Sequence, residues 1–371
     1  MSEFRLKLFA KQAKRLPMKL ALATVCKWSQ RATPETGLTV VIACMRRLLP
    51  LAMANLRLLQ RSDAPAVREI VLVFDCQREQ LGEANIAALQ KLGDKFVVRL
   101  RFYSAYQVRV LRAIDWGWCY AWLSWSIAVG ESRTRHVLLQ DLDALVLDPG
   151  FLQRRYEGAV ASGAAFYGMN HYYGSGITTA MGLCVTYELV IDVAAVRGRF
   201  AAIDAFNQVR LIEGRLVDFD TFLWIQHVIG SGVVSPEPEG TLMHPSQLIC
   251  NHTDLLNGRP IITKRLHSLP LMPYYNFLGD ENSPELREFG AALASGVSPE
   301  LAGCPVPIGH ITPSHWAWMY KQCVHCEQRL FGSPRPAVQE FLRGFAERAG
   351  DALPINDDAG FSTGVENGRR E

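Results

Sequence analysis

The stretch of sequence that decides the fold is His136-Val137-Leu138-Leu139-Gln140-Asp141-Leu142-Asp143-Ala144-Leu145-Val146-Leu147-Asp148-Pro149. Its apolar run, Val137 to Leu139, predicts a short buried strand, and a second apolar run ends at the turn signal Asp148-Pro149-Gly150. Asp141 and Asp143 therefore stand at the C-terminal end of a strand. In an open α/β sheet the ligand crevice lies beyond the carboxyl ends of the strands. Two carboxylates there suit a hard divalent cation that bridges phosphates.

Three more strand-like runs precede this stretch, with helical spacing between them. The runs are Leu38-Thr-Val-Val-Ile-Ala-Cys44, Glu69-Ile-Val-Leu-Val-Phe-Asp75 and Phe96-Val-Val-Arg-Leu100. Helices are expected over Pro50 to Arg61 and over about Glu79 to Leu92. Strands that alternate with helices predict an α/β fold, with a mostly parallel sheet flanked by helices.

The order of apolar strand, Asp-x-Asp, apolar residues and Asp-Pro resembles the metal motif of GT-A-type nucleotide-sugar glycosyltransferases, such as the family 2 or family 8 enzymes. The resemblance implies a Rossmann-like GT-A fold with C-terminal helical or irregular elements. It also implies that Asp143, with Asp141, binds Mn²⁺ or Mg²⁺, and that Asp141 contacts the metal or the ribose. A pair of turn aspartates is the alternative interpretation of an isolated Asp-x-Asp.

The same resemblance assigns the nucleotide base to the ends of the first two strands. In these glycosyltransferases the loop after the first strand and a carboxylate after the second strand hold the base. The matching positions in this sequence are Ala43-Cys44 and Asp75. Asp75 is equally well explained as a turn residue or a helix cap.

A carboxylate pair farther along the chain is the candidate for acid–base chemistry. Gly214 to Trp224 predicts the start of a helix that runs to about Ile229, with Asp218 and Asp220 near its N-terminus. The segment resembles the Glu-Asp-x-Asp segment of inverting family 2 enzymes, which would make Asp218 the general base. Val217 replaces the glutamate, and the Asp-Gln of retaining family 8 enzymes is also missing. Stereochemistry therefore stays open, and helix capping is the alternative role.

Histidines and cysteines near the C-terminus offer two further metal hypotheses. Gly309 to Trp318 resembles the late histidine and tryptophan of metal-dependent glycosyltransferases, so His310 would complete the metal shell; a surface or structural histidine is the alternative. Cys323-Val-His-Cys326 is a close pair, and a zinc site with nearby Cys304, His310 or His315 is conceivable. Its spacing matches no regular zinc module.

Aromatic residues mark two other features of the chain. Trp118, Trp122 and Trp125 recur at helical spacing within Tyr103 to Val129, where one long helix or two are expected, and such a stripe predicts core packing. Met169 to Gly176 is a loop rich in glycine and aromatic residues, whose amide and imidazole groups suit a sugar ring. An ordinary mobile loop is the alternative.

Composition is typical of a soluble globular protein, with 49% hydrophobic and 20% charged residues in a chain of 371. The net charge is only +3, so no nucleic-acid partner is predicted. Scattered cysteines inside apolar runs favour a reducing, cytoplasmic compartment, and no stretch looks long and apolar enough to span a membrane.

The N-terminal region has a distinct charge. Residues 1–34 contain one acid, Glu3, and eight basic residues: Arg5, Lys7, Lys11, Lys14, Arg15, Lys19, Lys27 and Arg31. This arm is expected to be a helix that packs on the domain. The alternative is a peripheral contact with anionic lipid at the inner face of the membrane.

Four regions are predicted from these patterns. They are a basic arm (1–35), a GT-A-type domain (36–270), C-terminal elements that cover the cleft (271–350) and a disordered tail (351–371). The expected activity is metal-dependent transfer of a sugar from a nucleotide-diphosphate donor to an unidentified glycan, lipid-linked or protein acceptor.

Two alternatives to this activity remain. One is a nucleotidyltransferase on a similar sheet, although Cys44-Met45-Arg46-Arg47-Leu48 lacks the glycines such enzymes carry after the first strand. The other is a non-catalytic scaffold that binds a nucleotide sugar.

Overall fold

The computed structural model describes residues 3–28, 33–245, 247–261 and 268–353. The chain divides into two compact units: unit 1 is Met1–Ala144 with Pro149–Pro236, and unit 2 is Leu145–Asp148 with Glu237–Glu371. This division differs from the predicted domain limits, which place a boundary at residue 270. Most of the predicted disordered tail, from residue 354 onward, lies outside the described residues.

Unit 1 is built on a seven-stranded sheet in the order β10-β6-β7-β4-β1-β2-β3. Neighbours among β4, β1, β2 and β3 pair in parallel, whereas β7 pairs antiparallel with both β4 and β6. The predicted α/β class, with a mostly parallel sheet flanked by helices, is therefore confirmed. The strands are β1 (Glu35–Cys44), β2 (Val67–Phe74), β3 (Val97–Phe102), β4 (Thr134–Gln140), β6 (Phe166–Gly168), β7 (Glu188–Asp192) and β10 (Gly232–Val234).

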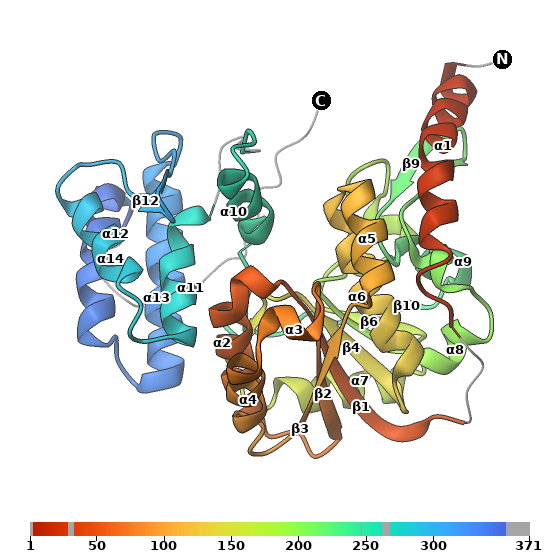
Figure 1. Cartoon of the computed structure of the whole chain (residues 1–371), viewed down its shortest axis with the longest axis horizontal. Helices are drawn as coiled ribbons and strands as arrows, with labels where there is room; N and C mark the ends of the chain where they lie inside the picture. Colours follow the sequence, from red (N-terminus) through yellow and green to blue (C-terminus); the bar gives the residue numbers. More distant parts are fainter. Residues whose placement is uncertain (1–2, 29–32, 246, 262–267, 354–371) are drawn as a thin grey trace. The chain divides into compact units, whose positions relative to one another are not determined.

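Helices cover both faces of this sheet, with α2 to α4 on one side and α5 and α6 on the other (Figure 1). Alternate strand residues such as Val41, Val71 and Val137 pack in one buried cluster with residues of α6, as expected for strands buried on both faces. The helices of unit 1 are α1 (Glu3–Leu22), α2 (Leu49–Gln60), α3 (Arg78–Leu81), α4 (Glu83–Lys91), α5 (Ala105–Ile114), α6 (Gly117–Glu131), α7 (Phe151–Ser162), α8 (Val193–Arg197) and α9 (Leu223–Ile229).

The tryptophan-rich segment forms two helices because Asp115 ends α5 in a left-handed conformation, with φ of 47°. Trp122 and Trp125 are buried in the core, as the helical stripe predicts. Trp118 is 43% exposed and is an exception to that prediction. Trp118, at the second position of α6, therefore lies at the edge of the core rather than in it.

The predicted helix from Gly214 is wrong over its first half, because residues 208–219 form a hairpin of β8 (Gln208–Ile212) and β9 (Arg215–Phe219). The two turn residues, Glu213 and Gly214, have φ of 48° and 78°. Positive φ at both positions is typical of the two-residue hairpin turn whose backbone twist matches that of the flanking strands. Asp218 consequently lies on a strand, and α9 begins only at Leu223.

Unit 2 is mainly helical, with α10 (Leu248–Leu256), α11 (Met272–Gly279), α12 (Glu285–Ala294), α13 (Pro313–Phe331) and α14 (Pro336–Ala349). A short antiparallel pair joins β5 (Leu145–Val146) to β11 (Leu242–Met243). Inside the unit, buried Glu327 accepts hydrogen bonds from Arg335 and Tyr274. In the part of the chain that the structure describes, no helix has the length and apolar character needed to cross a bilayer.

Candidate functional site

The Asp-x-Asp segment forms a tight turn directly after β4. The turn is closed by a hydrogen bond from the Ala144 amide to the Asp141 carbonyl (3.1 Å), and the Asp141 amide donates to the Tyr187 carbonyl (2.9 Å). Asp143 is almost fully buried, whereas Asp141 is half-buried. One carboxylate oxygen of each lies within 4.8 Å of the other. The two acids therefore share a space the size of a cation shell.

Two buried amide side chains fix the backbone of this turn. Asn55 Nδ2, on α2, donates to the carbonyls of Asp141 (3.4 Å), Leu142 (3.0 Å) and Ala144 (3.0 Å). Gln140 Nε2 donates to Asn55 Oδ1 (2.8 Å) and to the Ala144 carbonyl (2.6 Å). These bonds fix the backbone of the turn from which both carboxylates project, before any ligand binds.

Sequence reasoning missed Asn55 and Gln140 as functional residues. A signal was present, because Asn55 interrupts a helical face made of Leu51, Ala52, Leu56 and Leu59, all of which are buried. A polar side chain on such a face must find hydrogen-bond partners in the core. The sequence does not reveal which backbone groups those partners are.

A buried ion pair supports the neighbouring strand β7. Arg155 donates to both oxygens of Glu188, at 2.8 and 3.1 Å, and both side chains are fully buried. Glu188 also accepts from the Met169 amide (2.9 Å), and it lies opposite Gln140 in the β4–β7 register. This bidentate pair holds the start of β7 beside the end of β4.

The predicted nucleotide residues lie at the same edge of the sheet as Asp141. Ala43 is near the end of β1, and Asp75 directly follows β2. Because β1 lies between β2 and β4 and runs parallel to both, the three strand ends meet at one edge. The Arg46 amide donates to Asp75 Oδ1 (2.9 Å). Burial raises the pKa of the Asp75 carboxyl, and this hydrogen bond opposes the rise.

Asp218, the sequence-based choice for general base, is engaged by the N-terminal helix. Arg15 donates to both of its oxygens, at 2.7 and 2.8 Å, and Lys11 Nζ lies 3.4 Å from Oδ2. The Asp218 carboxylate therefore faces two cations. Both contacts tie the Asp218 side chain to α1.

Asp220 has a different environment, in the turn between β9 and α9. Its carboxylate accepts hydrogen bonds from Asn207 Nδ2 (2.9 Å) and from the Thr221 amide (2.7 Å). Burial raises the pKa of Asp220, and hydrogen bonds from Thr221, Trp118 and Asn207 oppose the rise. A buried carboxylate with a raised pKa is the kind of group that general-base chemistry uses.

The aromatic loop that was predicted to contact sugar is ordered by the β8–β9 hairpin. The Asp218 amide donates to the Ser175 carbonyl (2.9 Å), and a Cβ added at Gly176 would lie only 2.6 Å from the Leu216 carbonyl oxygen. Glycine at position 176 therefore permits the close approach of loop and strand. The contact with sugar stays a prediction.

The remaining candidates lie in unit 2. His310 is exposed in the turn before α13, and its role as a metal ligand stays a prediction. Cys323 and Cys326 are buried in α13, where burial raises the pKa of the Cys323 thiol. Among the described residues, neither cysteine belongs to a cluster of three metal-ligating side chains. His244 directly follows β11, in which Met243 pairs with Leu145.

Comparisons with known proteins find similar folds among glycosyltransferases. No protein-family model matches this chain, and no curated protein matches it. The crystal structure of TarS 1-349 from S. aureus is similar with a TM-score of 0.38 and 12% identity, over 84% of this chain and 90% of that chain. The crystal structure of TarS 1-349 in complex with UDP-GlcNAc has a TM-score of 0.37 and 10% identity, again over 84% of this chain and 90% of that chain. The glycosyltransferase GlyE of Streptococcus pneumoniae TIGR4 has a TM-score of 0.27 and 15% identity, over 44% of this chain and 38% of that chain.

Proposed function

We propose that this chain is a metal-dependent glycosyltransferase that moves a sugar from a nucleotide-diphosphate donor to an acceptor hydroxyl. The observation that carries the proposal is the turn from Asp141 to Ala144, which presents two carboxylates and whose backbone is held by buried Asn55 and Gln140. Paired carboxylates at the carboxyl edge of a parallel sheet suit a divalent cation that binds a diphosphate.

Asp141 and Asp143 are the proposed metal ligands. Their carboxylate oxygens form a donor set that accepts Mn²⁺ or Mg²⁺. When bound, the ion would neutralise the charge that builds up on the departing diphosphate.

The ends of β1 and β2 are proposed to hold the nucleotide base, through the backbone at Ala43 and the carboxylate of Asp75. The hydrogen bond from the Arg46 amide fixes the position of Asp75 Oδ1, which leaves the second oxygen as the acceptor for the base. A carboxylate held in this way would select one nucleotide base over another by hydrogen bonding rather than by charge alone.

Asp220 is proposed as the general base for the acceptor hydroxyl, with Asp218 in a structural role. The support is electrostatic: Asp218 already bonds to Arg15 at 2.7 and 2.8 Å, whereas burial raises the pKa of Asp220. A base with a raised pKa takes a proton from a hydroxyl more readily than an ordinary aspartate. Because a retaining enzyme needs no such base, this assignment also implies inversion.

A panel of nucleotide sugars tests the activity directly. Release of nucleotide diphosphate is measured with Mn²⁺, with Mg²⁺ and with a chelator, for the parent and for Asp143→Ala. Asp63→Ala is the matched control, because Asp63 is an exposed aspartate of the same unit. Metal-dependent release that only Asp143→Ala loses supports the proposal. Nucleotide binding without release identifies a non-catalytic binding protein, and the lack of both overturns the proposal.

His310, which the sequence motif predicts as a further metal ligand, is tested by substitution. If His310 binds the metal, His310→Ala should weaken Mn²⁺ binding by about tenfold or more, since even residues that only orient ligands have effects of that size. Isothermal titration with Mn²⁺ alone gives the answer without any donor sugar. Parental Mn²⁺ affinity of the variant would remove His310 from the metal shell.

The predicted cytoplasmic location and the peripheral contact with the inner face of the membrane are proposed separately from the catalytic activity.

A further inference from the structure

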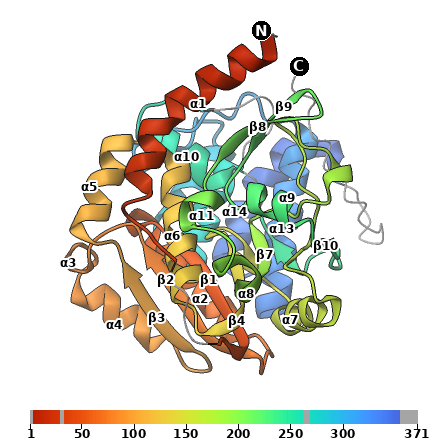
Figure 2. The same cartoon turned by 90° about the vertical axis from the view of Figure 1, so that its right-hand side faces the viewer.

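Helix α1 has an inner face that binds unit 1. Arg15 bonds to Asp218 on β9, and Gln12 Nε2 donates to the Val209 carbonyl on β8 (3.2 Å). Near the end of the helix, Met18 packs against the core and Leu22 is fully buried. Figures 1 and 2 both show α1 beside this hairpin. The helix is therefore a fixed part of unit 1 rather than a free arm.

The outer face of α1 is an exposed apolar stripe. Leu6, Phe9, Leu16 and Leu20 are 56, 68, 55 and 63% exposed. Their separations of three, seven and four residues place them on one side of a helix with 3.6 residues per turn. Ala13, which is also exposed, continues the stripe between Phe9 and Leu16. Large apolar side chains aligned on an exposed helix face mark an interaction surface.

Basic side chains border the apolar stripe. Arg5, Lys7 and Lys14 are exposed, and the helix has no acid after Glu3. Cations beside an apolar stripe attract anionic lipid head groups near a charged membrane surface. A polar face rich in lysine with Phe and Leu on the other face is the pattern of helices that lie in the membrane interface.

We propose that the outer face of α1 docks on the surface of an anionic lipid bilayer. Phe9, Leu16 and Leu20 would enter the boundary between head groups and acyl chains, and Lys7 and Lys14 would contact the head groups. Because Arg15 and Leu22 tie the inner face to unit 1, the bound helix holds the whole unit at the membrane surface. This inference does not depend on the proposed glycosyltransferase activity.

Charge favours a lipid surface over a second copy of the chain. Two copies that paired through the stripe would bring their lysines and arginines close together, and like charges at short range repel. An anionic bilayer instead offers an apolar interior together with opposite charge. An anionic bilayer therefore matches both the apolar stripe and the basic side chains that border it.

Vesicle sedimentation of the full chain tests the proposal. Binding is compared on phosphatidylglycerol-containing and pure phosphatidylcholine vesicles, at low and high salt. The double variant Phe9→Ser/Leu16→Ser removes two stripe residues, and Val160→Ser, which removes a 48% exposed valine on α7, is its control. We expect the double variant to lose about tenfold or more in partitioning, because most of the buried apolar area is removed. Val160→Ser should bind like the parent.

A charge variant completes the test. Lys7→Gln/Lys14→Gln should weaken binding to the anionic vesicles and reduce its salt dependence. Lys91→Gln, an exposed lysine on α4, is the control. Thermal melting checks that each variant is folded. The proposal is overturned if the parent does not sediment with anionic vesicles, if both stripe and control variants bind equally, or if the stripe variant abolishes only a dimer seen without lipid.

Discussion

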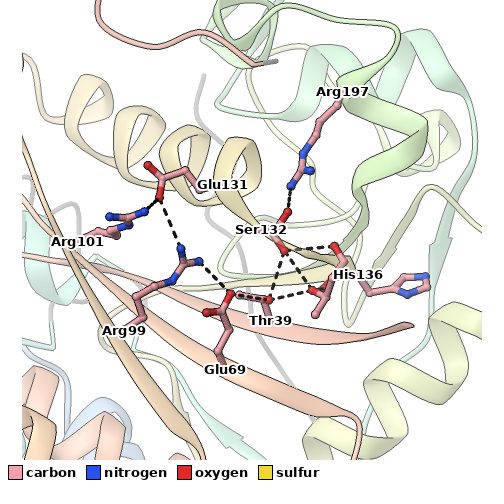
Figure 3. Close-up of polar contacts among 9 residues, drawn as sticks. Thr39, Glu69, Arg99, Arg101, Glu131, Ser132, His136 and Arg197 are labelled. Atoms are coloured by element: carbon pink, nitrogen blue, oxygen red, sulfur yellow. Dashed lines mark hydrogen bonds and ion pairs between the residues drawn. The ribbon is translucent and has the colours of Figure 1, made fainter. Parts of the chain in front are cut away.

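The two ends of the unit 1 sheet treat charged side chains in opposite ways. At the amino end, Arg99 Nη2 lies 2.9 Å from Glu69 Oε1 (Figure 3). Glu131, which precedes β4, lies with Oε2 2.5 Å from Nη2 of Arg101, a residue near the end of β3. Each acid there faces a guanidinium supplied by another element. At the carboxyl end, Asp141 and Asp143 come from one turn and face each other within 4.8 Å.

A hydroxyl network extends the amino end. Thr39 Oγ1 and Thr134 Oγ1 lie 2.8 Å apart, and Ser132 Oγ lies within hydrogen-bonding distance of both hydroxyls. Arg197 Nη2 donates to the Ser132 carbonyl (2.7 Å). Figure 3 shows these groups converging from β1, β4 and the end of α6. Such a network links β1, β4 and the end of α6, and its hydroxyl groups are already hydrogen-bonded to one another.

This difference suggests how to distinguish acids that stabilise the sheet from acids that bind a ligand: the partner that each acid faces. The acids at the amino end pair with arginines of neighbouring elements. Asp141 and Asp143 place two carboxylates close together, and like charges at short range repel. A divalent cation bound there, as proposed, would relieve that repulsion. Substitutions at the two ends should have opposite consequences.

The largest effect is expected for Asp143→Asn. Turnover should fall about a thousandfold, the upper range for loss of one electrostatic group at a reacting centre. The melting temperature without metal should stay level or rise, because the carboxylate repulsion is removed. Stabilisation by added Mn²⁺ should disappear. Glu69→Gln at the amino end is the control and should keep full turnover. Equal losses of turnover in both variants would show that the two ends of the sheet do not differ in function.

A smaller loss, about a hundredfold in turnover, is expected for Asp220→Asn. Burial raises the pKa of Asp220, and a base is active only when deprotonated. The kcat/KM of the parent should therefore decline on the acid side at a pH above the ordinary aspartate pKa. Asp218→Asn should keep turnover and lose only the contact with α1. Full activity of Asp220→Asn would remove this carboxylate from the mechanism.

Asn55→Ala should have an intermediate effect, because it loosens the turn without touching the metal ligands. We expect Mn²⁺ affinity to fall about tenfold, as for other residues that orient ligands, and turnover at saturating Mn²⁺ to recover most of the parental rate. The free energy of unfolding should fall by about 2 kcal/mol, because buried carbonyls lose their donor. Asn85→Ala, in which one exposed helix bond is lost, is the matched control. A variant with lower stability but parental Mn²⁺ affinity would make Asn55 purely structural.

The smallest effect is expected at the amino end itself. Glu131→Gln removes the partner of Arg101, and partly exposed ion pairs contribute at most about 1 kcal/mol. The difference in unfolding free energy between variant and parent should shrink at high salt. Turnover and Mn²⁺ affinity should not change. Any loss of metal binding would show that the two ends of the sheet are coupled.

The sequence predicts the sheet well because buried parallel strands are nearly continuous apolar runs, such as Val40 to Cys44. It also identifies Asp141 and Asp143, because the acids directly follow such a run. The partners of Asn55 are a different matter. They are three carbonyls about 90 residues away in the chain, and no local pattern encodes them.

The error at residues 208–219 has a local cause. Gln208 to Ile212 and Arg215 to Phe219 alternate around Glu213-Gly214, which is a hairpin signal, but the spacing of apolar residues after Gly214 also suits a helix. Tertiary contacts decide between the two, because Val217 and Phe219 pack in a small core with Ile177 and Leu183. The sequence-based preference for Asp218 over Asp220 rests on the resemblance to the family 2 segment, and the environments of the two carboxylates lie outside what that resemblance can show.

The place of β1 between β4 and β2 bears on the order in which the chain can be assembled. β1, β2 and β3 follow one another along the chain and can pair as soon as residue 102 is available, whereas β4 adds to the free side of β1. If assembly follows the chain, the turn that carries Asp141 and Asp143 is completed on a sheet that already exists. Amides on the β4 side of β1 should then gain protection from hydrogen exchange only in that second step. We therefore predict that the proposed metal site is a late product of folding.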